Sequence, residues 1–194
     1  MASIYSIAEK CKYIAGKGNL QAISSMVIDA YATVVRNSWF ENKAVDLNEV
    51  DGVFIYTFKN LVPQLDSDLN YYYIEKPSSA IRLPNELGIN QVSFMQGQTS
   101  PFARINAGSL GLWSNLKSYA LGGLQTYYEE GTRMYFPKMN QSTNGNILLK
   151  MAIALDTVDV EEELLIPPDV VDSIVSLVVE KLNPKESVKP ENLT

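Results

Sequence analysis

The sequence contains no histidine among its 194 residues. Without an imidazole side chain, the protein cannot build a Ser–His–Asp triad, a Cys–His pair, an HExxH zinc site or a facial site of two histidines and one carboxylate. These common classes of enzyme site are therefore excluded together.

Cysteine is nearly absent as well, because Cys11 is the single one in the chain. One thiol cannot form a disulfide within the chain, so a disulfide-stabilised scaffold is excluded. Cys11 falls on the apolar stripe of a predicted helix. This position favours a small buried hydrophobic side chain over a reactive thiol.

Basic residues are outnumbered, since 16 lysines and arginines stand against 22 acidic residues and the net charge is −6. Tight nucleic-acid binding needs basic side chains to neutralise phosphates, so the balance argues against it and against an anionic membrane surface. No apolar run approaches the ~20 residues of a membrane span. The opening MASIYSIAEK lacks the basic region and long apolar core of a signal peptide. We therefore expect a product of the cytosol that contacts no membrane.

What the sequence does contain is typical of a globular fold. Hydrophobic residues make up 46% and charged residues 20%, which is enough apolar material for a core. The length suits one domain with arms. We predict a single α+β domain over residues 1–183, followed by a flexible arm over 184–194.

Apolar residues recur with the helical period of 3.6 at both ends of the chain. Ser3 can cap a first helix over 3–15, which Gly16 ends. A second helix follows over about 20–40, and we expect the bulky pair Trp39 and Phe40 to end it. A last helix is expected over 167–182, because two prolines there fit its first turn.

Between these helices, residues 53–155 form a predicted β-rich body of short strands and tight turns. β-branched and aromatic residues predict strands over 53–59, 71–74, 80–83, 91–96, 102–105 and 147–155. The clearest hairpin joins 125–129 to 132–136 through Glu130-Gly131. A helix, a turn and an exposed loop are expected over 110–121, 85–88 and 140–146. The prediction is an α+β fold with N-terminal helices, a central antiparallel β region with hairpins, a C-terminal helix and an extended tail.

Three short motifs approach a catalytic or binding signature without completing one. The segment 16–18, Gly-Lys-Gly, has neither the first glycine nor the Ser/Thr of a phosphate loop. Ser109 lacks the first glycine of a nucleophile elbow, and no histidine exists to activate it. Asp46 and Asn48 alternate as in a calcium loop, but the central glycine and the terminal glutamate are missing. We predict no catalytic residue, no metal ligand and no cofactor.

Charged side chains leave two weaker possibilities open. The acids of 129–130 or 161–163 could supply a carboxylate pair for glycoside cleavage, but adjacent acids in turns usually form a solvated face. Arg82, Arg104 and Arg133 could bind an anion together, although ion pairs at the surface or between subunits are favoured. A hydrolase is therefore the least favoured hypothesis.

The 11 tyrosines, 6 phenylalanines and 2 tryptophans require an explanation of their own. Tyr71–Tyr73 and the hairpin tyrosines could form a stacking platform for sugars or bases. They could instead pack a sheet against neighbouring subunits, because aromatic residues are enriched at interfaces. The acidic balance disfavours bases. The polar loops and the apolar terminal helix favour assembly over carbohydrate binding.

Four phrases of the sequence carry a resemblance to a class of structural proteins. They are AYATVVRNSWFENKAVDLNEVDGVFIYTF, YYYIEKPSSAIRLPNELGI, QTYYEEGTRMYFPK and LLIPPDVVDSIVSLVVEKL. Their order is helix, helix, mixed β region and apolar C-terminal helix after a proline step. In this order they resemble the head-to-tail adaptor or ring proteins in the neck of podovirus-type and crAss-like bacteriophages.

The resemblance implies a non-enzymatic structural protein of the virion tail or neck, made in the host cytoplasm. Copies would form a ring, commonly a dodecamer, that contacts the portal and other tail proteins. DNA would pass through the channel without sequence readout. An acidic chain suits this passage, because a lumen that repels phosphates does not trap the duplex.

We expect the neighbour contacts to come from the terminal helix and the clearest hairpin. The residues are Val170, Val171, Ile174, Leu177 and Val178 on the helix, and Tyr127, Tyr128, Tyr135 and Phe136 on the hairpin. The alternative is that these side chains fill the subunit's own core. The rival to assembly as a function is a non-enzymatic β module that binds carbohydrate or another ligand.

Overall fold

The computed structural model describes residues 2–44, 50–83, 88–96, 100–110, 124–139 and 145–184. They belong to two compact units. The helical unit comprises Met1–Asn48 and Ala154–Thr194, and the β unit comprises Glu49–Ile153. That these units make one domain stays a prediction.

The first helix of the helical unit, α1 (Ile4–Ala15), begins and ends as the sequence predicts. Ser3 caps it through a capping box, in which its side-chain oxygen accepts a hydrogen bond of 3.1 Å from the backbone N–H of Ser6. Gly16 closes it in the left-handed conformation with a φ of 68°, which glycine adopts without a steric penalty. Cys11 is fully buried, and burial raises the pKa of its thiol.

The second helix, α2 (Leu20–Ala44), continues four residues past its predicted end near residue 40. Trp39 and Phe40 were expected to end it, but Trp39 is fully buried while Phe40 is 56% exposed, and the helix continues through both. No glycine or proline interrupts the sequence between Leu20 and Ala44. The helix therefore continues, because no residue in this range has the low helix propensity of glycine or proline.

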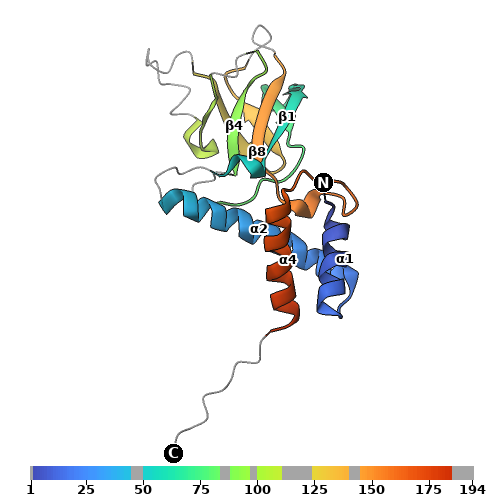
Figure 1. Cartoon of the computed structure of the whole chain (residues 1–194). Coiled ribbons are helices and arrows are strands. Elements are labelled where there is room, and N and C mark those ends of the chain that lie inside the picture. The colour runs from blue at the N-terminus through green and yellow to red at the C-terminus, as the bar shows by residue number, and fades with distance from the viewer. Residues whose placement is uncertain are drawn as a thin grey trace, which may run out of the picture. The chain divides into compact units, whose positions relative to one another are not determined.

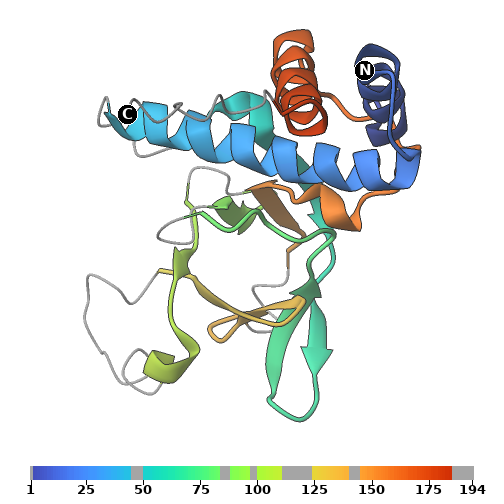
Figure 2. The same ribbon diagram turned by 90° about the horizontal axis from the view of Figure 1, so that it is seen from below.

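The last helix, α4 (Pro168–Leu182), has a proline in its first turn, which confirms the predicted start. It contacts both α1 and α2, and Figures 1 and 2 show α1 and α4 on the same side of the long α2. Ile174 and Val178 are fully buried in these contacts. An ion pair of 2.9 Å between Lys10 and Asp172 joins α1 to α4, but both side chains are exposed, so it contributes at most about 1 kcal/mol.

The β unit contains a three-stranded and a five-stranded sheet. The first has the order β1-β8-β4 and is antiparallel, as Figure 1 shows. The second has the order β2-β3-β7-β6-β5 and is antiparallel except for the pair β5–β6. The bounds are β1 Ile55–Leu61, β2 Gln64–Asp66, β3 Tyr71–Glu75, β4 Ile89–Phe94, β5 Ala103–Arg104, β6 Thr126–Glu130, β7 Arg133–Phe136 and β8 Ile147–Ala152. The predicted α+β class with an antiparallel β region is confirmed.

The hairpin β6–β7 is the best predicted feature of the β unit. It turns at Gly131, whose φ is 58°, and it pairs Tyr128 with Tyr135. The two rings stack with their centroids 5.2 Å apart and an interplanar angle of 16°. Together with Ile105 they form a small hydrophobic core cluster. Cross-strand aromatic pairs of this kind contribute roughly 0.2–1 kcal/mol.

Some predicted strands differ from the structure. Residues 80–83 form only a single bridge, between Ala80 and Ile153, instead of a strand. Prolines stand on both sides of this segment, and proline supplies no N–H to a ladder. Strand β1 begins at Ile55, after a 3-10 turn over Gly52–Phe54, and β8 ends at Ala152.

Several predictions fall outside the described residues. They are residues 85–87 of the turn at 85–88, nearly all of the helix at 110–121, most of the loop at 140–146, the candidate calcium loop at 46–48 and the arm after residue 184.

Candidate functional site

The hairpin residues predicted to contact neighbours lie inside the β unit. The exposed fractions of Tyr127, Tyr128, Tyr135 and Phe136 range from 0% to 5%. Burial, with the nearby carboxylate of Glu130 as the second cause, raises the pKa of Tyr128 to about 12. These rings therefore fill the core of this chain, which favours the alternative reading of the sequence. They also offer little ring surface on which a sugar could stack.

On the terminal helix the predicted contact residues divide into two groups. Val170, Ile174 and Val178 are buried. Val171 and Leu177 are half-buried, so only these two offer apolar surface to a neighbour. Their place at an interface stays a prediction.

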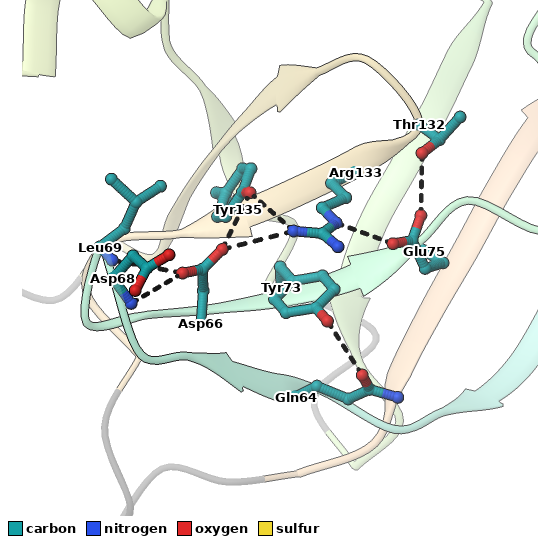
Figure 3. A network of polar contacts seen from close by, with 9 residues as sticks. All are labelled: Gln64, Asp66, Asp68, Leu69, Tyr73, Glu75, Thr132, Arg133 and Tyr135. Atoms are coloured by element: carbon teal, nitrogen blue, oxygen red, sulfur yellow. Dashed lines mark hydrogen bonds and ion pairs between the residues drawn. The ribbon is translucent and has the colours of Figure 1, made fainter.

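Arg133, one of the three arginines considered as an anion site, belongs to a network on the five-stranded sheet (Figure 3). Its Nε donates to Glu75 at 2.8 Å, and its Nη1 lies 3.4 Å from the carboxylate of Asp66. The Tyr135 hydroxyl donates to the same Asp66 oxygen at 3.2 Å. The guanidinium also lies 4.4 Å from the ring centroid of Tyr73. Arg133 is therefore engaged within its own sheet, where it joins β2, β3 and β7.

The network lowers the pKa of both carboxyl groups. For Asp66 the first cause is the hydrogen bond from the backbone N–H of Leu69, whereas for Glu75 it is the hydrogen bond from Arg133. Because the folded-state pKa values lie below the ordinary 3.8 and 4.5, the unfolded chain binds more protons in that range. The network thus stabilises the fold above the ordinary values, and this contribution is lost as pH falls through the lowered ones.

Substituting Arg133→Met should make the acid dependence of stability shallower. The free energy of unfolding of the unchanged protein should fall as pH drops below about 4.5, and less so in the variant, because Glu75 there loses the first cause of its lowered pKa. Urea denaturation at a series of pH values measures both slopes. Lys59→Met, at an exposed lysine of β1, is the matched control. Equal slopes for Arg133→Met and the unchanged protein would show that the ion pair does not form in solution.

Lys76, Arg104 and Arg82 line a groove of about 590 Å³ in the β unit. Lys76 directly follows β3, and its backbone N–H donates to the carbonyl of Thr132 at 2.8 Å. Arg104 lies on β5, and Glu129 on the adjacent β6 lines the same groove. The five-stranded sheet therefore supplies two cations and one carboxylate.

The segment around Arg82 forms another wall of the groove. The bridge at Ala80 and a hydrogen bond of 2.8 Å from the Ile81 N–H to the carbonyl of Ala152 hold this segment against β8. Ile81 and Leu83 are buried while Arg82 between them is exposed, as alternation along an extended chain requires. Within the described ranges Arg82 has no hydrogen-bond or ion-pair partner.

Glu129 lies between two of the cations. One carboxylate oxygen is 2.9 Å from Lys76 Nζ, and the other is 2.7 Å from an Nη atom of Arg104. The three side chains are only 13–28% exposed, so solvent screens these pairs less than it screens surface pairs. Arg82 adds a third cation to the groove, and it has no partner among the described residues. The groove can therefore accept an anion.

Gly88 shows how closely the walls of the groove approach. A Cβ atom at this position would overlap the backbone carbonyl oxygen of Ile81. The carbonyl of Gly88 accepts a hydrogen bond of 2.8 Å from the N–H of Ala152. Only glycine fits between these two segments without a shift of the backbone.

The structure separates the three arginines that the sequence analysis considered together. Of the three arginines, Arg82 and Arg104 meet in one groove, and Arg133 belongs to the separate network. Lys76 was missed, because nothing in its local sequence distinguishes it from a solvated lysine. Glu129 and Glu130 lie on opposite faces of a strand, so they do not converge as a catalytic pair. No cluster of three or more potential metal-ligand side chains occurs within the described ranges.

No helix in the part of the chain that the structure describes is long and apolar enough to cross a membrane. Comparison with protein-family models and with curated protein sequences finds no match to this chain.

Proposed function

We propose that this protein is a non-enzymatic subunit of an oligomeric ring in the head-to-tail connector of a short-tailed bacteriophage. The ring, a dodecamer in this proposal, contacts the portal and other tail proteins in the virion. DNA passes through its channel without sequence readout, and the net charge of −6 limits trapping of the duplex.

The phrases that carry the resemblance support this proposal through their place in the fold. Their described parts fall on α2, β1, β3, the hairpin β6–β7 and α4. They are thus spread over both units and supply much of each core. The resemblance therefore extends over both units of the chain and is not confined to one motif.

The observation that carries the proposal is the apolar free edge of the five-stranded sheet. Strand β2 is an edge strand, with β3 on one side and no further described strand on the other. Val62, Leu65 and Leu69, in and beside β2, are 66%, 50% and 46% exposed. An edge with unpaired backbone groups and exposed apolar side chains is a site for pairing with another chain. A neighbouring subunit would cover it.

Electron microscopy and light scattering of the purified chain, alone and with portal or neighbouring tail proteins, test the proposal. Ring-shaped particles should form, with these proteins if not without them. A chain that stays monomeric in every mixture would contradict it.

A double variant tests whether the free edge at β2 is the interface between subunits. Val62→Lys with Leu65→Lys should reduce ring formation by charging the free edge, and should leave the free energy of unfolding nearly unchanged, because both side chains are exposed. Val53→Lys is the control, at an equally exposed apolar position outside β2. Rings that persist with the charged edge would place the interface elsewhere.

A further inference from the structure

An acidic segment of the helical unit provides a chemical counterpart to the groove. It comprises Asp159–Glu163, with the sequence Asp-Val-Glu-Glu-Glu, and it precedes α4. All five residues are exposed, and none of the four carboxylates makes an ion pair within the described chain. Val160 within the segment and Leu165 two residues after it are 41% and 71% exposed, and they add apolar surface.

The acidic segment has a defined shape. The Asp159 side chain accepts a hydrogen bond of 3.1 Å from the Glu161 N–H. The backbone carbonyl of Asp159 accepts one of 3.0 Å from the Glu162 N–H. The Val160 carbonyl accepts a hydrogen bond of 2.9 Å from the N–H of Tyr5 at the start of α1. Because the turn is already formed, binding it costs less conformational entropy than ordering a free peptide.

The groove has donors left for such a segment. Glu129 occupies one direction of Lys76, but an ammonium has three N–H donors. Arg82 stands at the same groove with its charge uncompensated among the described residues. A carboxylate that binds here would therefore accept charge-assisted hydrogen bonds from cations that solvent screens only in part.

We propose that the acidic segment Asp159–Glu163 of one copy of this chain binds in the basic groove of the next copy. This inference rests on the proposed function and names a contact of the ring. The two surfaces belong to different units of the chain. When the contact repeats in one direction from copy to copy, it is heterologous. Heterologous contacts repeat head to tail, and they close into a ring when the rotation between copies allows it.

Carboxylates fit this groove better than the phosphates of a nucleic acid do. Glu129 lies among the cations and repels a densely charged backbone, and the whole chain is acidic. A segment of four carboxylates with apolar flanks can place single charges beside Arg82 and Lys76. Every copy of the chain carries both surfaces, so the segment is always present at the same concentration as the groove.

Charge reversal in two separate full-length variants tests the contact. Arg82→Glu with Lys76→Gln leaves Arg104 facing two carboxylates in the groove, and Glu161→Lys with Glu162→Lys and Glu163→Lys reverses the segment. Arg82 and the three glutamates are exposed, and glutamine keeps a polar side chain at the position of Lys76, so both proteins should fold. Each variant alone should lose ring formation, because like charges then meet. An equimolar mixture should regain it, since each reversed surface meets an opposite one on the other variant.

Two control variants change charge elsewhere on the surface. Lys59→Glu and Glu180→Lys change charge at exposed positions outside the two surfaces and should leave rings intact. Single variants that still assemble, or a mixture that fails to regain assembly while the unchanged chain forms rings, would overturn the contact. Failure of the mixture is also the result expected if the segment and the groove bound each other within one chain.

A peptide measurement keeps this inference separate from the proposed function. A synthetic peptide of residues 156–165, DTVDVEEELL, should bind the segment-reversed full-length chain, whose own segment no longer competes. Arg82→Glu added to that chain should weaken binding at least about tenfold, and binding should weaken with salt. The result is the same whether or not rings form. No binding of the peptide, or tighter binding of a short DNA duplex or of inorganic phosphate, would contradict the assignment.

Discussion

Phe136→Ala should lower the free energy of unfolding of the β unit by about 3–5 kcal/mol. Phe136 is fully buried on β7, where it stands opposite Tyr72 of β3. Its ring meets that of Phe102 edge to face, with centroids 5.7 Å apart and planes at 84°. Removing the ring leaves a cavity that the paired strands cannot close without breaking their register.

Urea denaturation of the β unit measures this loss, and Leu65→Ala is its control. Leu65 lies in the same sheet but is 50% exposed, so its truncation should cost about 0.5 kcal/mol or less. The sequence placed Phe136 at a subunit interface. If Phe136→Ala abolished assembly and left stability unchanged, that assignment would be right and the buried position wrong.

Ile174→Ala should cost about 2–5 kcal/mol in the helical unit. Ile174 is fully buried on α4, which packs against both α1 and α2. Truncation removes contacts at the junction of three helices, and the helix backbones cannot all move inward to fill the space.

Val171→Ala on the same helix is the matched control, because Val171 is only half-buried and its loss should cost less than about 1 kcal/mol. Peptide-level hydrogen exchange gives the readout and also examines the prediction of a single domain. If the two units unfold together, Ile174→Ala should speed exchange in β8 as well as in the helices. Faster exchange confined to the helices would show that the units unfold separately. Equal costs for the two substitutions would contradict the packing of α4.

Helix ends were predictable wherever a local interaction determines them. Ser3 and Gly16 lie within one turn of the residues that they cap, and the prolines before α4 act through their own rings. The end of α2 was predicted too early, because two bulky side chains resemble a stop in sequence but do not break a helix. The hairpin β6–β7 was predictable for the same local reason, since its turn glycine adjoins both strands.

The direction in which each side chain faces required the tertiary structure. Tyr71, Tyr128 and Tyr135 look alike in the sequence, yet the first is half-buried and the other two are core residues, because strand pairing and sheet packing decide their exposure. The pairing order β2-β3-β7-β6-β5 joins segments separated by tens of residues. Such order depends on which distant strands bury each other's apolar faces.

The sequence by itself excluded histidine-based sites and an internal disulfide. It also determined the α+β class and the local signals that begin and end the helices and the clearest hairpin. These follow from residue types and from interactions over a few positions. Only the tertiary structure brought Lys76 and Arg104 to Glu129, placed Arg82 at the same groove and left Arg133 in a different network. The reason is physical: a groove of excess positive charge arises from the pairing of distant segments, and no local pattern encodes which charges will meet.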